Sequence, residues 1–512
     1  MSRFRQRCRR AGVTVGDVHE DFERCYRAVQ SKDTRFDGWF VTAVLTTRIY
    51  CRPSCPVRPP FARNVRFLPT AAAAQQAGFR ACKRCRPDAS PGSPEWNVRG
   101  DLVARAMRLI ADGTVDRLGV GGLAAHLGYT ARQVERVLRA EAGAGPLALA
   151  RAQRAQTARL LIETTDLSFG DVAFAAGFSS IRQFNDTVRL VFESTPTALR
   201  RSAAARPEPA KSANPSPGAV SLRLPVRTPF AYEGVFGHLA ATAVPGCEEV
   251  RAGSYRRSLR LQAGNAVVAL APAADHVRCR LALADFRDLA TAIARCRRLL
   301  DLDADPEAVV DALADDPALG PVVARAPGQR IPRTVDEAEL AVRAVLGQQV
   351  STQAATTHAG RLAAAYGHPI HDPEGALTHT FPSIDQLADI DPAHLAVPGV
   401  RRRALSALVS GLAQGHVVLD AGSDWTRARE QLLVLPGIGP WTVEVIAMRA
   451  LGDPDAFPAG DLGLRLAAQR LGFPAGQRAL VAHSARWRPW RSYATQHLWT
   501  TLAHPVNHWD VA

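Results

Sequence analysis

The chain has 512 residues and a formal net charge of +15, and this length predicts three or four domains. Of that charge, +11 falls within residues 1–100, +3 within 101–201 and +1 in the remainder, so the front of the chain favours a polyanionic partner. No apolar run is long enough to cross a bilayer, and no apolar segment follows the arginine-rich start, so we expect neither a membrane span nor a secretory signal.

Cysteine usage favours a reducing compartment. Five of the nine cysteines are scattered along the chain without a pattern: Cys8, Cys25, Cys247, Cys279 and Cys296. Such unpaired thiols are typical of cytoplasmic proteins, in which disulfides are rare. We therefore expect a cytoplasmic protein.

The other four cysteines form two close pairs, C-R-P-S-C with Cys51 and Cys55, and C-K-R-C with Cys82 and Cys85. Two such pairs indicate a tetrahedral zinc site, because thiolates are the soft ligands that zinc prefers. Basic residues crowd the same stretch: Arg48, Arg52, Arg58, Arg63, Arg66, Arg80, Lys83, Arg84 and Arg86. Spacing alone favours a structural zinc site on a nucleic-acid-binding protein, since most four-cysteine sites are structural.

The segments around these cysteines are more specific than their spacing. T-T-R-I-Y-C-R-P-S-C-P, R-N-V-R-F and A-G-F-R-A-C-K-R-C-R-P resemble the amino-terminal domain of the Ada family, methyl-accepting regulators of the bacterial response to alkylation. The resemblance covers residues 17–90. It implies one Zn²⁺ per chain on all four cysteines, with Cys51 accepting a methyl group from a methylated DNA phosphate. That phosphotriester is uncharged and does not repel a thiolate, and the thioether product makes the transfer stoichiometric.

After a turn-rich joint, residues 88–97, the stretch 98–201 has helical periodicity throughout. It contains two helix-turn-helix patterns. In the first, L-A-A-H-L-G-Y-T-A-R-Q-V-E-R-V-L, Gly128 forms the turn and Thr130 caps the next helix. In the second, D-V-A-F-A-A-G-F-S-S-I-R-Q-F-N-D-T-V, we expect Gly177 and Ser179 in the same roles.

A single pattern of this kind is also compatible with a generic helical bundle. Two patterns followed by F-E-S-T-P-T-A-L-R-R resemble the AraC-type DNA-binding domain. The resemblance places residues 130–140 and 179–190 in DNA major grooves. The candidate readers on these helices are Arg132, Gln133, Arg136, Arg182, Gln183 and Asn185.

A linker rich in proline and alanine, residues 202–218, comes next. Residues 219–285 are expected to form strands, because S-L-R-L-Q and H-V-R-C-R-L-A-L alternate between apolar and polar residues. From about residue 285 the pattern becomes helical, beginning with A-T-A-I-A-R-C-R-R-L-L.

Residues 432–446, L-L-V-L-P-G-I-G-P-W-T-V-E-V-I, contain a helix-hairpin-helix turn. Gly437 and Gly439 permit a tight turn whose backbone amides bind a DNA phosphate without reading sequence. Downstream, Asp461 lies in F-P-A-G-D-L-G-L-R. Taken alone, this aspartate is equally compatible with a helix cap.

Four segments in order resemble AlkA-type 3-methyladenine DNA glycosylases: residues 341–351, residues 436–442, the Asp461 loop and residues 486–499. The resemblance implies that Asp461 is the catalytic carboxylate. It also implies that Gln349 or its neighbour Gln348 fills the gap left by the extruded nucleotide. Trp441 and Trp499 would line the pocket for the flipped base.

The chemistry follows from charge. Ring alkylation makes a purine cationic and a good leaving group, and a carboxylate stabilises the oxocarbenium ion that forms as the base departs. No lysine occurs in residues 219–512, so we expect a monofunctional glycosylase without Schiff-base lyase activity. Val445, Leu462 and His238 stand where the family's type member has aromatics, and the pocket is therefore expected to be less aromatic. No P-C-H-R motif is present, so guanine O-alkyl repair is not expected.

The expected fold is multidomain α+β. It consists of a basic tail (1–16), a small four-cysteine zinc domain (17–90), an all-α double helix-turn-helix domain (98–201), the linker, an antiparallel β subdomain (219–290) and an all-α helix-hairpin-helix domain (291–512). The expected partners are alkylated and promoter double-stranded DNA, with RNA polymerase as a further candidate and no membrane. A bacterial, nucleoid-associated location follows.

Three functional hypotheses remain open. The first is a methylation-sensing activator fused to a glycosylase that excises alkylated purines such as 3-methyladenine. In the second, the glycosylase module senses damage without efficient turnover. In the third, the zinc site is only structural and transfers no methyl group.

Overall fold

The computed structural model describes residues 19, 21–32, 36, 39–55, 57–82, 85, 87, 102–204, 219–273, 276–390, 399–474 and 476–509. The chain forms two compact units, Met1–Lys211 and Ser212–Ala512. The expected tail, the joint at 88–97, linker residues 205–218, and Cys8, Lys83, Arg84 and Arg86 lie outside the described residues.

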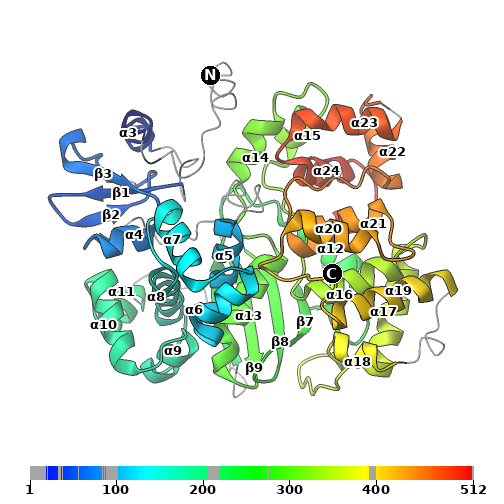
Figure 1. Ribbon diagram of the computed structural model, residues 1–512, viewed down its shortest axis with the longest axis horizontal. Helices are drawn as coiled ribbons and strands as arrows, with labels where there is room; N and C mark the ends of the chain where they lie inside the picture. Colours follow the sequence, from blue (N-terminus) through cyan, green and yellow to red (C-terminus); the bar gives the residue numbers. More distant parts are fainter. Residues whose placement is uncertain are drawn as a thin grey trace. The chain divides into compact units, whose positions relative to one another are not determined.

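The first unit begins with a small sheet of strand order β3-β1-β2-β4 (Figure 1). Strands β1–β3 pair antiparallel, whereas β4 runs parallel to β2. Phe40 and Phe67 pack edge to face beneath the sheet, with ring centres 5.2 Å apart. The elements are α3 (Phe22–Gln30), β1 (Val41–Val44), β2 (Ile49–Cys51), η2 (Ala62–Asn64), β3 (Val65–Leu68), α4 (Ala71–Gln76) and β4 (Arg80–Ala81).

The rest of this unit is helical, as expected. Its helices are α5 (Leu102–Ala111), α6 (Thr114–Leu127), α7 (Ala131–Ala142), α8 (Pro146–Thr164), α9 (Phe169–Ala175), α10 (Ile181–Phe192) and α11 (Pro196–Ala204). Gly128 and Gly177 form the two turns with φ of +76° and +85°, and Thr130 caps α7 through a capping box. The cap of α10 was assigned to the wrong serine: Ser180 caps it, because Ser179 instead donates to the side chain of Gln183.

The four-stranded sheet β3-β1-β2-β4, with helix α4, packs on the helices of the same unit. The Thr70 hydroxyl donates to the carbonyl of Ala142 over 2.9 Å in a buried contact. Gly143 follows with φ of +68°, and a Cβ there would lie 2.8 Å from Pro69. This close approach requires a glycine, so α4 and the end of α7 form a fitted interface.

The second unit begins with a five-stranded antiparallel sheet of order β5-β9-β8-β7-β6 (Figure 1). The alternation expected in β9 is confirmed, since Val277, Cys279 and Leu281 are buried. The expectation of strands alone was incomplete, because a helix, α12, separates β5 from β6. The elements are β5 (Ala219–Pro225), α12 (Tyr232–Ala241), β6 (Glu248–Arg251), β7 (Ser254–Arg260), β8 (Asn265–Pro272) and β9 (His276–Leu283).

Helices make up the remainder of the unit around two hydrophobic clusters. None of the described helices has the length and apolarity of a membrane span. The elements are η4 (Phe286–Asp288), α13 (Leu289–Leu299), α14 (Pro306–Leu313), α15 (Gly320–Arg325), α16 (Glu337–Leu346), α17 (Thr352–Tyr366), α18 (Ile384–Ala388), α19 (Gly399–Ala413), α20 (Trp425–Leu433), α21 (Pro440–Ile446), the π-helical η6 (Ala447–Leu451), α22 (Leu462–Arg470), α23 (Gln477–Ser484), η7 (Ala485–Trp487), α24 (Arg491–Trp499) and η8 (Pro505–Asn507).

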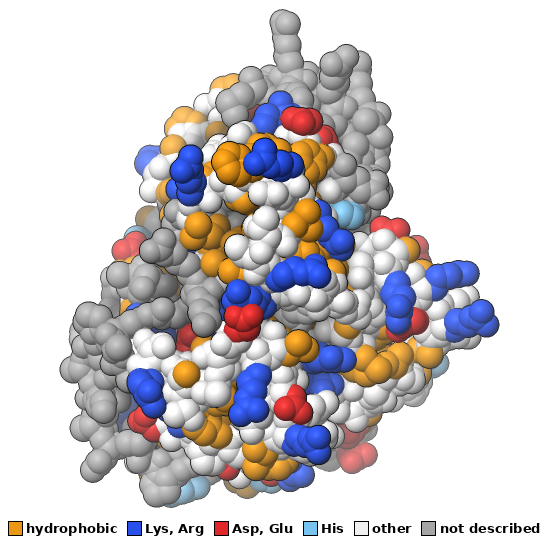
Figure 2. Space-filling view, turned by 90° about the vertical axis from the view of Figure 1, so that its left-hand side faces the viewer, with side chains coloured by type: hydrophobic (Ala, Val, Ile, Leu, Met, Phe, Trp, Pro, Cys, Tyr) orange, Lys and Arg blue, Asp and Glu red, His pale blue; other side chains and the backbone are white. Residues whose placement is uncertain are grey.

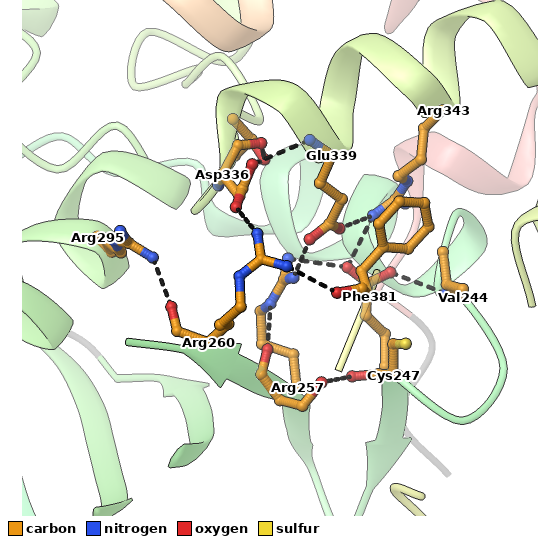
Figure 3. A network of polar contacts seen from close by, with 12 residues as sticks. Val244, Cys247, Arg257, Arg260, Arg295, Asp336, Glu339, Arg343 and Phe381 are labelled. Atoms are coloured by element: carbon orange, nitrogen blue, oxygen red, sulfur yellow. Dashed lines mark hydrogen bonds and ion pairs between the residues drawn. The ribbon is translucent and has the colours of Figure 1, made fainter. Parts of the chain in front are cut away.

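A buried ionic network joins the sheet to α16 (Figure 3). Glu248 on β6 accepts from Arg257 on β7 over 3.0 Å and from Arg343 on α16 over 2.9 Å. Glu339 on α16 accepts from the same two arginines over 2.8 and 3.0 Å. Four charges are thus paired in a ring. The network fixes α16, which leads directly into Gln348 and Gln349.

Candidate functional sites

The four cysteines predicted as metal ligands meet in the first unit. Their sulfur atoms all lie within 4.8 Å of one another. The parallel pairing of β2 with β4 brings the two pairs together, because Tyr50 opposes Ala81 and the next residues are Cys51 and Cys82. Cys51 is partly exposed, whereas Cys55, Cys82 and Cys85 are buried. The residue predicted to accept a methyl group is therefore the one of the four that is not fully buried.

The donor set fits a divalent soft metal. Four sulfurs this close match a tetrahedral thiolate site, the arrangement typical of structural zinc. Within the cluster, the neighbouring thiols of Cys55, Cys82 and Cys85 and then burial raise the pKa of Cys51. A bound divalent cation would reverse this effect and hold the sulfurs as thiolates.

Basic side chains surround the cluster. Arg48, Arg58, Arg63 and Arg66 are exposed, and the guanidinium groups of Arg48 and Arg66 lie 5.3 and 5.6 Å from the centre of the Phe79 ring. Cation–π contacts of this kind hold an arginine in place while its N–H groups stay available to phosphates. On the face shown in Figure 2, Lys and Arg side chains are spread among hydrophobic ones rather than gathered in one patch.

The predicted base readers lie on α7 and α10, the second helix of each helix-turn-helix. Arg132, Arg136 and Arg182 are exposed there, and Asn185 is partly buried. The side chains of Gln133 and Gln183 already make hydrogen bonds within their own helix-turn-helix. The carbonyl oxygen of Gln133 accepts from the backbone of Thr130 and that of Gln183 from the Ser179 hydroxyl, each over 3.0 Å. Only their amide N–H groups remain for reading a base.

In the second unit, Asp461, Trp441 and Trp499 meet. The Asp461 carboxylate accepts from the indole nitrogens of Trp441 and Trp499, each over 3.0 Å, at different oxygens. Asp461 is also the N-cap of α22 and accepts from the Leu464 amide over 2.7 Å. The helix-cap interpretation and the catalytic one are therefore compatible in a single side chain.

The loop that carries Asp461 is braced from α20 and α21. Arg429 pairs with Glu444 and with Asp453, each over 2.7 Å, and Glu444 accepts from the Phe457 amide over 2.8 Å. These residues line a pocket of about 510 Å³ beside Trp441. Because the charges of these pocket residues are paired with one another, we assign them a structural role: they hold the loop in place.

The hairpin between α20 and α21 has the expected form. Gly437 has φ of +80°, and a Cβ there would lie 2.8 Å from Ala404. Gly439 has an ordinary φ of −97° and open space around it. Among the described residues, neither amide donates to a backbone carbonyl. Gly437 is thus required by the turn, whereas Gly439 leaves the amides accessible to a phosphate.

The structure distinguishes the two glutamines that the sequence left as alternatives. The side chain of Gln348 donates to the carbonyl of Gly437 and to the hydroxyl of Thr442, each over 3.0 Å. Gln349 is exposed and has φ of +54°, a conformation that is uncommon for a non-glycine residue. Gln348 therefore braces the hairpin, and Gln349 is the better candidate for insertion into DNA.

Two polar residues beside the carboxylate were not found from the sequence as a pair. Arg449 contacts Nε2 of His238 through Nη1, and its guanidinium lies 5.4 Å from the centre of the Trp499 ring. Arg449 lies in the π-helical segment η6, a rare conformation that is frequent at functional sites. The two residues are 211 positions apart, so no local pattern connects them. Leu462, one of the positions expected to make the pocket less aromatic, is 67% exposed.

Comparison with known families assigns four segments of the chain. Residues 24–88 match the metal binding domain of Ada, and residues 123–202 match a helix-turn-helix domain family. Residues 221–336 match the AlkA N-terminal domain. Residues 342–492 match the HhH-GPD superfamily of base excision DNA repair proteins.

Three curated proteins span these segments. The "Probable bifunctional transcriptional activator/DNA repair enzyme AlkA" of Mycobacterium tuberculosis is 79% identical over 96% of this chain and 99% of its own length. "DNA-3-methyladenine glycosylase 2" of Escherichia coli is 35% identical over 53% of this chain and 94% of its own length. The "Bifunctional transcriptional activator/DNA repair enzyme Ada" of Escherichia coli is 33% identical over 32% of this chain and 46% of its own length.

Proposed function

Since the chain belongs to the family of bifunctional transcriptional activator/DNA repair enzymes of the AlkA type, we propose that it couples two responses to DNA alkylation. Its front senses methylated phosphates and activates transcription, and its back excises alkylated purines such as 3-methyladenine. The observation that carries the repair function is the Asp461 carboxylate held between two indole N–H groups.

In the proposed base excision, the negative charge of the Asp461 carboxylate stabilises the positive charge that develops on the sugar. The bond between C1′ and the base breaks, its electron pair leaves with the base, and the sugar becomes an oxocarbenium ion. Asp461 stabilises that cation, and water then adds to C1′ and loses a proton. Two indole N–H groups hold the carboxylate in place, so it need not reorganise during the reaction. Trp441 and Trp499 also offer ring faces against which a flipped base can stack.

The product is an abasic site in an unbroken strand. Glycosylases that also cut the strand need an amine to form a Schiff base with the sugar. No lysine occurs in residues 219–512, and Trp441 stands just after the hairpin. The activity is therefore monofunctional.

In the proposed methyl transfer, Cys51, Cys55, Cys82 and Cys85 would hold one zinc ion, which would keep their sulfurs deprotonated. The Cys51 sulfur attacks the methyl carbon of a phosphotriester, a sulfur–carbon bond forms, and the carbon–oxygen bond breaks. The phosphate oxygen keeps the electron pair and regains its negative charge. The exposed arginines around the cluster bind the neighbouring phosphates of the same strand.

The same reaction provides a switch. Methylation of Cys51 removes one negative charge from a surface that approaches phosphates, and affinity for DNA rises as repulsion falls. Arg132, Arg136 and Arg182 would read the promoter, and Gln183 would contribute its amide donors. RNA polymerase is the proposed further partner, and the bacterial nucleoid is the proposed location.

The test combines both activities in one sample of the full-length protein. We expect one zinc per chain, release of 3-methyladenine from alkylated duplex DNA, and transfer of labelled methyl groups from methylphosphotriesters to Cys51. Cys51→Ser should abolish the transfer and leave base release unchanged. Tight binding of alkylated DNA without base release would support a damage sensor instead, and labelling of the Cys51→Ser variant would reject the assigned acceptor.

A further inference from the structure

Arg401, on α19, is a buried cation that the reaction proposed above does not use. It is 9% exposed, and its Nη2 donates to the backbone carbonyl of Gln348 over 2.6 Å. Its Nε and Nη1 are buried and have no hydrogen-bond partner among the described residues, and no described carboxylate forms an ion pair with it. A cation that leaves water for one carbonyl costs stability, and such an arrangement is expected where a function requires it.

The residue that Arg401 contacts is also held from a second side. The side chain of Gln348 donates to the carbonyl of Gly437 and to the hydroxyl of Thr442, each over 3.0 Å. Helix α19 reaches the same hairpin one turn later, because a Cβ on Gly437 would lie 2.8 Å from Ala404. The start of α19 therefore holds the main chain of Gln348, and the hairpin and α21 hold its side chain.

The orientation of the Gln348 carbonyl affects the conformation of Gln349. The carbonyl of one residue and the amide of the next lie in one rigid peptide plane, so a fixed carbonyl also fixes the amide nitrogen of Gln349. The φ of Gln349 is +54°, a left-handed conformation that is unfavourable for a residue with a Cβ. On the other side, Ser351 caps α17 and accepts from the Ala354 amide over 3.2 Å. Gln349 is thus held between two fixed points, with its side chain exposed.

We propose that Arg401 is a positioning residue for base extrusion: through the Gln348 carbonyl, it keeps Gln349 in the left-handed conformation that presents its side chain to the gap left by the flipped nucleotide. The inference rests on the proposed glycosylase function and adds a residue to the same site. Extrusion leaves a space in the base stack, and a side chain that is already held in place fills it without a further ordering cost. If Gln349 relaxed to an ordinary conformation, extrusion from a paired duplex would become slower.

The experiment compares two DNA substrates that differ in whether extrusion leaves a gap. In the first, 7-methylguanine is paired with cytosine in a duplex. In the second, the same base lies in a single-nucleotide bulge, where it has no opposite nucleotide and is cheaper to unstack. Arg401→Met should lower single-turnover release by the full-length protein about tenfold from the paired duplex, the factor that corresponds to the cost of a left-handed residue. Release from the bulge should fall less than about twofold. The melting temperature should not fall, because the variant removes an unpaired buried charge.

Three further variants separate positioning from charge and from packing. Arg401→Lys keeps a cationic donor, which suffices for one bond to a carbonyl, and should retain most of the rate on the paired duplex. Arg403→Met removes an exposed arginine of the same helix and should change both rates by the same factor. Gln349→Gly adopts a left-handed conformation freely and has no side chain to insert. In that background, Arg401→Met should change the ratio of the two rates little further.

Equal slowing of both substrates by Arg401→Met would make Arg401 a packing residue and overturn the inference. If Arg401→Met does not fold, Arg401→Gln removes the charge with a polar side chain and should shift the ratio in the same direction. Fluorescence of 2-aminopurine placed beside the lesion in the paired duplex reports unstacking even where no base is released, so absent release by the wild type would overturn only the glycosylase function. This fluorescence should rise less with Arg401→Met than with the wild type, and an equal rise would overturn the inference.

Discussion

At the scale of single residues, Asp461 combines a structural and a chemical role. A helix cap needs one accepted hydrogen bond, from the Leu464 amide. The carboxylate accepts two more, from Trp441 and Trp499. Indole N–H groups can only donate, so they favour a charged carboxylate over any group with an N–H or O–H at the same position.

Asp461→Asn is expected to reduce base release about 100-fold or more, because it removes the charge that stabilises the oxocarbenium ion. It also turns an amide N–H toward an indole N–H. Affinity for DNA should be retained, since the hairpin and Gln349 are unchanged. Asp424→Asn, which alters the aspartate that caps α20, is the matched control and should keep its turnover. Undiminished release by Asp461→Asn would show that another carboxylate is catalytic.

His497 links the stability of the second unit to pH. It is fully buried, and among the described residues neither ring nitrogen has a hydrogen-bond partner. Burial lowers its pKa to about 4 from an ordinary value of 6.5. Between these values the unfolded chain binds more protons than the folded one, so the free energy of unfolding falls as the pH is lowered. The full contribution is about 3 kcal/mol, present above pH 6.5 and lost by about pH 4.

His497→Leu should flatten that part of the pH dependence. Urea unfolding followed by tryptophan fluorescence suits this test, because six of the eight tryptophans lie beyond residue 219. The difference in unfolding free energy between pH 7 and pH 4.5 should be smaller in the variant by a large part of this contribution. His416→Leu, which changes an exposed histidine, should keep the wild-type slope. A variant slope equal to that of wild type would mean that His497 is protonated in the fold.

At the scale of elements, the hairpin between α20 and α21 depends on its two glycines for different reasons. Gly437 supplies a left-handed conformation and a close approach to Ala404. Gly439 needs neither, since its φ is ordinary and the space around it is open. What Gly439 provides is access for a phosphate to the amides at the start of α21.

Gly437→Ala and Gly439→Ala should therefore behave differently. The first is expected to destabilise the second unit by about 1–2 kcal/mol, the cost of a left-handed residue with a Cβ, and to weaken DNA binding. The second should leave the melting temperature unchanged and weaken only the affinity for undamaged duplex DNA. Thermal unfolding and fluorescence anisotropy on both variants provide the measurements. If Gly439→Ala binds DNA like wild type, its amides do not contact a phosphate.

At the scale of the whole molecule, each unit depends on one polar assembly. In the second unit, the ring of Glu248, Arg257, Glu339 and Arg343 ties the sheet to α16 (Figure 3). In the first unit, the four-cysteine cluster holds together two very short strands, β2 with three residues and β4 with two. Neither assembly tolerates the loss of one member, because its partners would stay buried and unpaired.

Glu248→Gln should lower the unfolding free energy of the second unit by about 3–5 kcal/mol, because it leaves the buried Arg257 and Arg343 with one carboxylate between them. The tryptophan fluorescence transition in urea reports the loss. Glu307→Gln, a change of the same kind in the first turn of α14, is the control and should shift the transition little. A Glu248→Gln transition at the wild-type midpoint would mean that the network contributes no net stability.

Removal of zinc should unfold residues 24–88, because small metal domains take their folding free energy from the metal. Limited proteolysis after treatment with a strong chelator should cleave this region rapidly. Base release by the same sample should be unchanged, since Asp461 and the hairpin belong to the other unit. Continued protection of residues 24–88 after zinc loss would contradict a metal-dependent fold.

The sequence by itself determined what local spacing encodes. The cysteine pairs, both helix-turn-helix patterns, the hairpin and the alternation of β9 are short motifs whose residues contact near neighbours, so their spacing fixes their geometry. The assignment of the four domain types from these motifs is confirmed by the matching families. The catalytic role of Asp461 and the methyl acceptor role of Cys51 stay predictions.

Only the tertiary structure decided what depends on distant contacts. Helix α12 was missed, because much of it is buried against other elements and lacks the one-sided pattern of a surface helix. The roles of Gln348 and Gln349 separated only when Gly437 and Thr442 came within hydrogen-bond reach of Gln348. The pairing of Arg449 with His238 spans 211 positions. Packing, rather than any pattern along the chain, places a buried cation beside Asp461, because burial is decided by what the folded elements bring together.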